Sequence, residues 1–133
     1  MSVDFLKSPL PTVMVIDDYP DAAESMALLL RTHGYDASVA LTSHEALETN
    51  PVPDAVILEL RLRDSDGCEL VRSLREKAGE TDPTFIAVTT CGRPEDFDRS
   101  ARAGISAHLV KPANVDDVLS ALSHVSFEHT WRY

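Results

Sequence analysis

The feature that most constrains the fold is a regular alternation between short apolar runs and longer amphipathic ones. Residues 13–16 and 55–58 are continuously apolar, and the first run, with Thr12 before it, is rich in β-branched side chains. Strands buried on both faces of a sheet have this pattern, because neither face needs a polar residue. In the longer runs, apolar residues recur at three- and four-residue spacing, which is typical of helices with one buried face. The chain is therefore expected to alternate strands with helices.

Turn and capping residues mark where the expected helices begin and end. Pro20 is suited to a first helical position, and Gly34 to a helix end. Thr42, Asp66 and Asn114 are each followed three residues later by an acidic residue, a spacing typical of N-terminal caps. The expected strands are residues 12–16, 35–40, 55–58, 84–88 and 105–110, and the expected helices begin near residues 20, 42, 66, 94 and 114.

Five strands alternating with five helices predict an α/β fold with a parallel sheet. Right-handed crossovers would then place helices on both faces of that sheet. A chain of 133 residues fits one domain. We expect this domain at residues 12–126, after a lead-in at residues 1–11 and before an aromatic-bearing tail at residues 127–133.

Composition excludes several classes of function. Aspartate and glutamate outnumber lysine and arginine by 22 to 12, so no basic surface is expected to bind nucleic acid. Cys68 and Cys91 are too few for a disulfide framework or a zinc site. No apolar run approaches the length of a membrane span, and the N-terminus lacks the pattern of a signal peptide. A soluble, cytoplasmic protein without membrane contact is expected.

Chemically distinctive side chains follow four of the apolar runs. They are Asp17 and Asp18, then Glu59, Thr89 and Lys111. Because the carboxyl ends of parallel strands meet at one edge of a sheet, we expect these groups to converge there. Carboxylates, a hydroxyl and an ammonium group together suit a phosphoryl group and a divalent cation such as Mg²⁺. Three converging carboxylates repel one another unless a cation or Lys111 offsets their charge.

Each of these residues taken alone also has an ordinary structural interpretation. Asp17 and Asp18 could cap the following helix, and Lys111 could be a surface lysine before a turn proline. Thr89 could be a β-branched strand residue, and Thr90 beside it leaves the assignment by spacing open. The hypothesis of a site therefore depends on the whole set rather than on any one member.

The ordered set of motifs resembles the receiver domain of two-component response regulators. The resemblance covers roughly residues 12–124. It is carried by Val13-Met14-Val15-Ile16-Asp17-Asp18, by residues 54–62 leading to Asp66-Gly67, by residues 86–90, and by residues 103–112 ending in Lys111-Pro112.

The resemblance implies a fold and a metal site. The fold would be a flavodoxin-like, doubly wound sheet of five parallel strands in the order 2-1-3-4-5, with five helices. Asp17 and Asp18 would bind Mg²⁺ together with the backbone carbonyl of Arg61, and Glu59 would supply a third carboxylate. Glu59 would stand at the phospho-acceptor position.

The resemblance also implies a switch and an output surface. Thr89 would be the switch hydroxyl, and Lys111 would bridge to phosphoryl oxygens. His108 would match a ring that turns inward on activation, although a lone strand histidine is more often simply packed. The fourth helix, fifth strand and fifth helix would form the output surface and could support a homodimer. A sensor histidine kinase or another signalling protein would be the partner.

Two residues depart from the family pattern. Glu59 takes the place of the acceptor aspartate, and Arg63 takes a place where proline is usual. The extra methylene moves the carboxylate by about 1.5 Å, and a misplacement of about 1 Å can cost on the order of a hundredfold in rate. We therefore expect a receiver module with impaired or absent phosphorylation, in which Glu59 pairs with Lys111 and Mg²⁺ binds weakly or optionally at Asp17 and Asp18.

Three other interpretations remain open from the sequence. The chain could be an ordinary phosphorylatable receiver, with Glu59 either engineered or tolerated. It could be a small phosphatase that forms an aspartyl-phosphate intermediate, although such enzymes need a cap that this chain has no insertion to supply. It could also be a docking module with a vestigial site. A signalling protein rather than an enzyme is expected.

Overall fold

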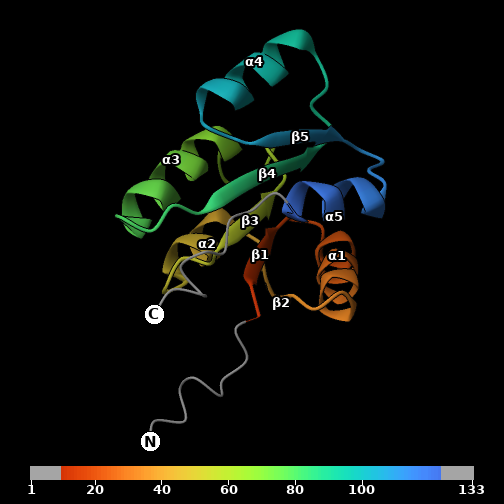
Figure 1. Ribbon diagram of the computed structural model, residues 1–133. Coiled ribbons are helices and arrows are strands. Elements are labelled where there is room, and N and C mark those ends of the chain that lie inside the picture. Colours follow the sequence, from red (N-terminus) through yellow and green to blue (C-terminus); the bar gives the residue numbers. More distant parts are fainter. Residues whose placement is uncertain (1–9, 124–133) are drawn as a thin grey trace, which may run out of the picture.

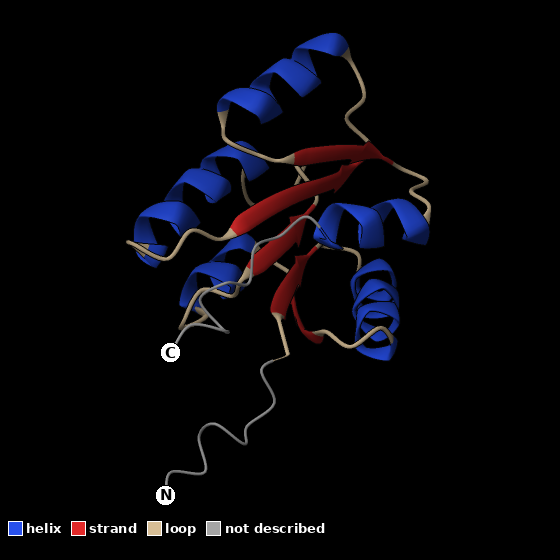
Figure 2. Cartoon of the chain, viewed as in Figure 1, coloured by secondary structure: helices blue, strands red, loops and turns tan. Residues whose placement is uncertain are grey.

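The computed structural model describes residues 10–123, which form five strands and five helices in strict alternation (Figures 1 and 2). In chain order these are β1 (Thr12–Ile16), α1 (Pro20–Thr32), β2 (Asp36–Ala40), α2 (Ser43–Glu48), β3 (Ala55–Leu58), α3 (Gly67–Ala78), β4 (Thr84–Thr89), α4 (Pro94–Arg102), β5 (Ala107–Val110) and α5 (Val115–Ser123).

The strands form one sheet in the order β2-β1-β3-β4-β5, with every neighbouring pair parallel. In the register, Ile16 of β1 lies opposite Leu58 of β3, and Thr89 of β4 lies opposite Val110 of β5. The order reverses beside β1, because the chain moves to β2 on one side and then to β3 on the other. The predicted flavodoxin-like fold is confirmed.

Two apolar cores hold helices on both faces of the sheet. Helices α1 and α5 lie on one face, and α2, α3 and α4 lie on the other (Figure 1). Ala27 and Leu30 of α1 pack in one core with Leu122 of α5. Val71 and Leu74 of α3 pack in the other core. Alternate residues of each central strand enter opposite cores, which explains why the strands are apolar throughout.

The helix ends follow the predicted signals. Thr42 Oγ1 accepts a hydrogen bond from Glu45 N, and Asp66 caps α3 by accepting one from Cys68 N. Gly34 follows α1 with a φ of 91°, a conformation that glycine adopts without strain. The Asn114 side chain caps α5 by accepting a hydrogen bond from Asp116 N; like Asp66, it binds one residue earlier than the predicted spacing.

The fifth strand begins later than the sequence suggests. Residues 105–110 were expected to be extended, whereas β5 begins at Ala107. Ile105 N donates a hydrogen bond back to Ser100 O, so this residue still belongs to the turn that ends α4. The apolar side chain of Ile105 led to a predicted strand that starts two residues too early. The hydrogen bonds after α4 determine where the strand begins.

The predicted lead-in and tail are the two ends of the chain. The predicted tail at residues 127–133 and all but the last two residues of the predicted lead-in lie outside the described residues. Among the described residues, no helix is long and apolar enough to cross a membrane. The Lys111–Pro112 peptide bond, immediately after β5, is cis.

Candidate functional site

Four polar side chains from four different strand ends meet at the carboxyl edge of the sheet. Asp17 follows β1, Glu59 follows β3, Thr89 ends β4 and Lys111 follows β5. The Asp17, Glu59 and Thr89 residues are buried, with 6%, 5% and 0% of their surfaces exposed. The strand order makes this convergence possible, because β1, β3, β4 and β5 are neighbours in the sheet.

Glu59 is the centre of the contact network. Its Oε2 accepts hydrogen bonds from the Thr89 hydroxyl and from Arg61 N, the latter at 3.0 Å. Its Oε1 lies 3.2 Å from Lys111 Nζ. Both carboxylate oxygens are therefore engaged by groups of the protein.

Lys111 lies between two carboxylates. Its Nζ donates a hydrogen bond of 2.7 Å to Asp17 Oδ2, which is shorter than its 3.2 Å contact with Glu59. Asp17 Oδ1 accepts a further hydrogen bond from Tyr19 N at 3.0 Å. The pairing with Asp17 was not expected from the sequence, which indicated Glu59 as the partner of Lys111.

The pKa values of Glu59 and Lys111 shift in opposite directions. Burial raises the pKa of Glu59, but the Thr89 hydroxyl, Arg61 N and Lys111 together bring it below its ordinary value. Burial lowers the pKa of Lys111, but the hydrogen bond and charge of Asp17, and then those of Glu59, raise it above its ordinary value. Both shifts favour the charged form, so the pair is ionised at neutral pH.

The structure distinguishes Thr89 from Thr90. Thr89 is fully buried with its hydroxyl on Glu59, whereas Thr90 is exposed. Thr89 Oγ1 also accepts a hydrogen bond of 3.1 Å from Cys91 N. The Thr89 hydroxyl therefore links the carboxylate to the first residues of the loop before α4.

His108 lies outside the carboxylate cluster but is connected to it through that loop. Its Nε2 lies 2.7 Å from Cys91 O, so the ring nitrogen donates to this carbonyl. The ring packs on Phe97 of α4, with ring centroids 4.1 Å apart. The path from Glu59 to His108 runs through Thr89 and Cys91. The role of Cys91 could not be read from residue type, because its backbone rather than its thiol makes both contacts.

Asp18 is held by a residue that the motif pattern marks as unusual. Arg63 N donates a hydrogen bond of 2.7 Å to Asp18 Oδ2, and Arg63 Nε lies 3.7 Å from the same oxygen. Within residues 10–123, no group of three or more acidic, histidine or cysteine side chains is arranged to hold a metal ion. The carboxylates of Asp17 and Glu59 share the Lys111 ammonium group, and Asp18 contacts Arg63, so the metal-ligand set expected from the sequence stays a prediction.

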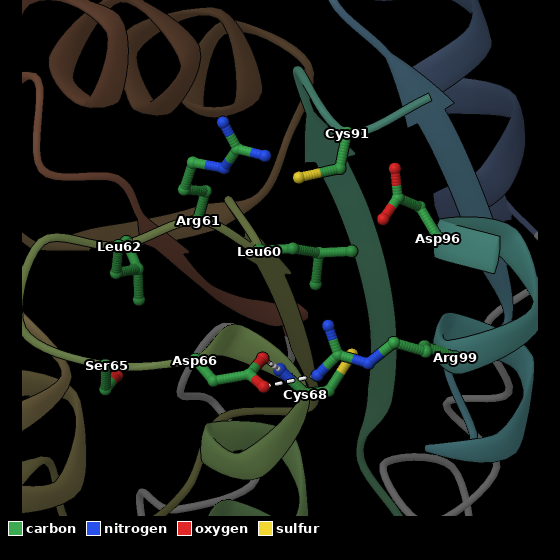
Figure 3. A pocket seen from close by; sticks show the side chains of 9 residues that line it. All are labelled: Leu60, Arg61, Leu62, Ser65, Asp66, Cys68, Cys91, Asp96 and Arg99. Atoms are coloured by element: carbon green, nitrogen blue, oxygen red, sulfur yellow. Dashed lines mark hydrogen bonds and ion pairs between the residues drawn. The ribbon is translucent and has the colours of Figure 1, made fainter. Parts of the chain in front are cut away.

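A separate cavity of about 290 Å³ lies between the loop after β3 and α4 (Figure 3). Asp66 and Arg99 form an ion pair along its wall. Both cysteines line it, and they are free thiols. Burial, and then the charge of Asp66, raise the pKa of the Cys68 thiol, which makes it a poor nucleophile. This cavity does not include Asp17, Glu59, Thr89 or Lys111.

The model of the response regulator receiver domain family matches residues 13–123, which is most of the chain. The chain belongs to the response regulator receiver domain family. As a receiver domain it is a signalling module, of a type that interacts with histidine kinases and other signalling proteins.

Curated relatives agree with this family. An uncharacterised 14.6 kDa protein of Leptolyngbya boryana is 32% identical over 77% of this chain and 79% of its own length. The transcriptional regulatory protein PrrA of Mycobacterium leprae is 33% identical over 77% of this chain but only 44% of its own length. The receiver therefore spans less than half of that regulator.

Solved structures show the same fold. A CheY-like receiver domain of Methanospirillum hungatei superposes with a TM-score of 0.79 at 24% identity, covering 91% of this chain and 96% of its own. A response regulator of Burkholderia pseudomallei has a TM-score of 0.77 at 26% identity, covering 84% and 66%. That second protein was solved with a phosphorylated aspartic acid, a calcium ion and citrate.

Proposed function

We propose that this receiver signals with impaired or absent phosphorylation, because Glu59 stands at the phospho-acceptor position. The observation that carries the proposal is the engagement of both Glu59 oxygens by Thr89, Arg61 N and Lys111. Thr89 acts as the switch hydroxyl and Lys111 as the charge partner, and His108 senses their state through the loop before α4. The Glu59 carboxylate imitates the phosphoryl group that phosphorylation would otherwise attach.

The chemistry of phosphoryl transfer supports this assignment. A carboxylate oxygen must attack in line with the leaving group, and a misplacement of about 1 Å can cost on the order of a hundredfold in rate. The side chain of Glu59 is one methylene longer than aspartate, which moves its oxygens by about 1.5 Å. One of these oxygens lies 3.2 Å from Lys111, the group that would otherwise hold a phosphoryl oxygen.

The imitation is incomplete. A carboxylate is planar and carries one negative charge, whereas an attached phosphoryl group is tetrahedral and carries nearly two. Lys111 is shared between Asp17 and Glu59, so the single charge of Glu59 does not hold the ammonium group alone. The module therefore keeps one arrangement of Asp17, Glu59 and Lys111. It signals through protein contacts rather than through turnover of a substrate.

Receiver domains generally bind Mg²⁺ at their phosphorylation site. The carboxylates of Asp17 and Asp18 suit this hard cation, which prefers oxygen ligands and keeps several waters. The Glu59 carboxylate and the Arg61 carbonyl complete the proposed set of protein ligands. Binding is weak, because Asp17 already contacts Lys111 at 2.7 Å and Asp18 already contacts Arg63. The cation would balance the carboxylate charge rather than take part in catalysis.

Output runs through protein partners in the cytoplasm. The receiver unit spans residues 12–126, and its output surface comprises α4, β5 and α5. Phe97 and Val110 are large apolar residues exposed on that surface, at 41% and 40%. A sensor histidine kinase or another signalling protein is the partner.

The same surface supports a homodimer. Sedimentation equilibrium tests the dimer, since Val110→Glu would weaken association through this surface.

Acetyl phosphate with Mg²⁺, followed by intact mass measurement, tests the proposal. The native chain is expected to gain no stoichiometric phosphoryl adduct. Glu59→Asp is the matched control, because it keeps the charge and removes one methylene. Labelling of this variant would show that the rest of the site is competent. A stoichiometric adduct on Glu59 of the native chain would overturn the proposal.

A further inference from the structure

Arg63 holds Asp18 by two contacts from the loop that follows β3. Its backbone N–H donates at 2.7 Å to Asp18 Oδ2, and its guanidinium Nε lies 3.7 Å from the same oxygen. The Asp18 side chain is 10% exposed, whereas that of Arg63 is 72% exposed. A solvated guanidinium thus meets a carboxylate that has little other access to water.

The Arg63 guanidinium is also placed by an aromatic ring. Its central carbon lies 5.1 Å from the centroid of the Tyr19 ring, within the range of a cation–π contact. Asp18, Tyr19, Arg63 and Lys111 all line one cavity of about 260 Å³. The guanidinium therefore borders the space in front of the Asp18 carboxylate, where a cation bound to that carboxylate would lie.

We propose that Arg63 is a built-in counter-ion of Asp18 that competes with divalent cations for the carboxylate edge of this site. The inference rests on the proposed binding of Mg²⁺ at Asp17 and Asp18. Three carboxylates, those of Asp17, Asp18 and Glu59, face two cations of the protein, Lys111 and Arg63. One net negative charge remains, and a site with so little excess charge attracts a divalent cation weakly.

The two protein cations differ in how easily a metal ion displaces them. Lys111 lies between two buried carboxylates, with its own side chain 26% exposed. Arg63 contacts one carboxylate from the solvent side, and its own side chain is 72% exposed, so a metal ion that binds Asp18 can take its place as the counter-ion. Arg63 is therefore the cation that yields first to a metal ion. Its competition is modest and depends on salt, because exposed ion pairs are weak and screened.

Titration of the full chain with Mg²⁺ at low ionic strength, by calorimetry and by backbone amide NMR, tests this inference. Arg63→Gln removes the guanidinium charge and keeps the backbone N–H that binds Asp18. We expect this variant to bind Mg²⁺ about two- to fivefold more tightly, which is the range for an exposed ion pair. Arg63→Lys keeps the charge and should remain near the native affinity. The gain should shrink in 0.5 M salt.

Arg102→Gln is the matched control. Arg102 also forms an exposed ion pair, with Asp98, and its side chain is 71% exposed, but it lies on α4 away from Asp18. Equal affinities of the native chain and Arg63→Gln, or an equal gain in Arg102→Gln, would overturn the inference. Failure of both the native chain and Arg63→Gln to bind Mg²⁺ at tens of millimolar would also overturn it. Phosphorylation of Glu59 would refute the proposed function and leave this affinity comparison unaffected.

Discussion

At the scale of single residues, ion pairs between side chains of the protein define the site. Lys111 contacts both Asp17 and Glu59, and Arg63 contacts Asp18, so each of the three carboxylates has a cation of the protein beside it. Buried carboxylates without such partners would be strongly unfavourable. The cations of the protein therefore stabilise the three carboxylates at the strand ends.

Lys111→Met tests the importance of the ammonium group. We expect a loss of about 3 kcal/mol in the free energy of unfolding at pH 7, because the variant leaves buried carboxylates without their cation. Urea denaturation measures the loss. Lys77→Met, which removes an exposed lysine that donates to the Leu47 carbonyl, is the control and should cost far less. A native-like stability for Lys111→Met would contradict this account.

The stability difference between the native chain and Lys111→Met depends on pH. The folded-state pKa of Glu59 is lowered, so its stabilising contribution is present above its unfolded pKa and is lost as the pH falls through the folded value. The folded-state pKa of Lys111 is raised, so its contribution is present below its unfolded pKa and is lost as the pH rises through the folded value. The stability difference between the native chain and Lys111→Met should therefore be widest near neutrality. It should narrow below about pH 4 and above about pH 10.5.

Thr89→Val tests the switch hydroxyl at nearly constant shape. The variant removes the donor to Glu59 and the acceptor for Cys91 N, both at a fully buried position. We expect a loss of about 1–3 kcal/mol, measured by urea denaturation, because buried partners are left unsatisfied. Thr89→Ser keeps the hydroxyl and should keep the lowered pKa of Glu59. A Thr89→Val chain that is as stable as the native one would argue against the hydrogen bond.

At the scale of elements, the loop between β3 and α3 does most to place the site. Glu59, Arg61 and Arg63 all lie on it, and its first residues pack against the start of α3. Gly67 N donates a hydrogen bond of 2.8 Å to Leu60 O. A Cβ atom at Gly67 would lie 2.6 Å from Leu60 Cα and 2.9 Å from Glu59 O. Only glycine allows the first turn of α3 to approach the backbone that carries Glu59.

Gly67→Ala should therefore disturb both stability and the site. We expect a loss of about 2–3 kcal/mol, because a backbone atom rather than a flexible side chain must move. Gly92→Ala is the control: the atoms nearest its Cβ would be the two Val110 methyl groups, at 3.2 and 3.3 Å, and the change should cost less because a side chain can move. Thermal unfolding gives the ranking, and amide NMR shifts of residues 59–63 report on the site. A Gly67→Ala cost no greater than that of Gly92→Ala would refute the packing argument.

At the scale of the whole molecule, the sheet separates two cores that stabilise the fold independently of the site. Leu122 of α5 is fully buried with α1, whereas Leu28 of α1 is 60% exposed. Leu122→Ala should cost about 2–5 kcal/mol, the usual range for a buried leucine. Leu28→Ala should change the stability by no more than about 0.5 kcal/mol. Calorimetric unfolding of both variants makes the comparison, and equal costs would contradict the assigned packing.

The sequence by itself determined the order and kind of the elements. Continuous apolar runs, Pro20, Gly34 and the caps at Thr42 and Asp66 act locally, within a few residues of the structure they produce. The rule that parallel strands share a carboxyl edge then placed Asp17, Glu59, Thr89 and Lys111 together. The start of β5 was misplaced by two residues, because the hydrogen bond from Ile105 to Ser100 is not visible in a hydrophobic pattern, whereas the bounds of β2 and β4 each differed by one residue.

The tertiary structure alone decided which charged groups pair. Asp17 is the nearer partner of Lys111, and Arg63 is the partner of Asp18. These choices depend on differences of an ångström or less between side chains that three loops bring together. Electrostatic energy varies with such distances and with burial, and neither quantity is encoded in residue type or local spacing. The pattern of residues therefore predicted the fold and the composition of its strand-end site. The distribution of charge contacts within that site followed from the fold.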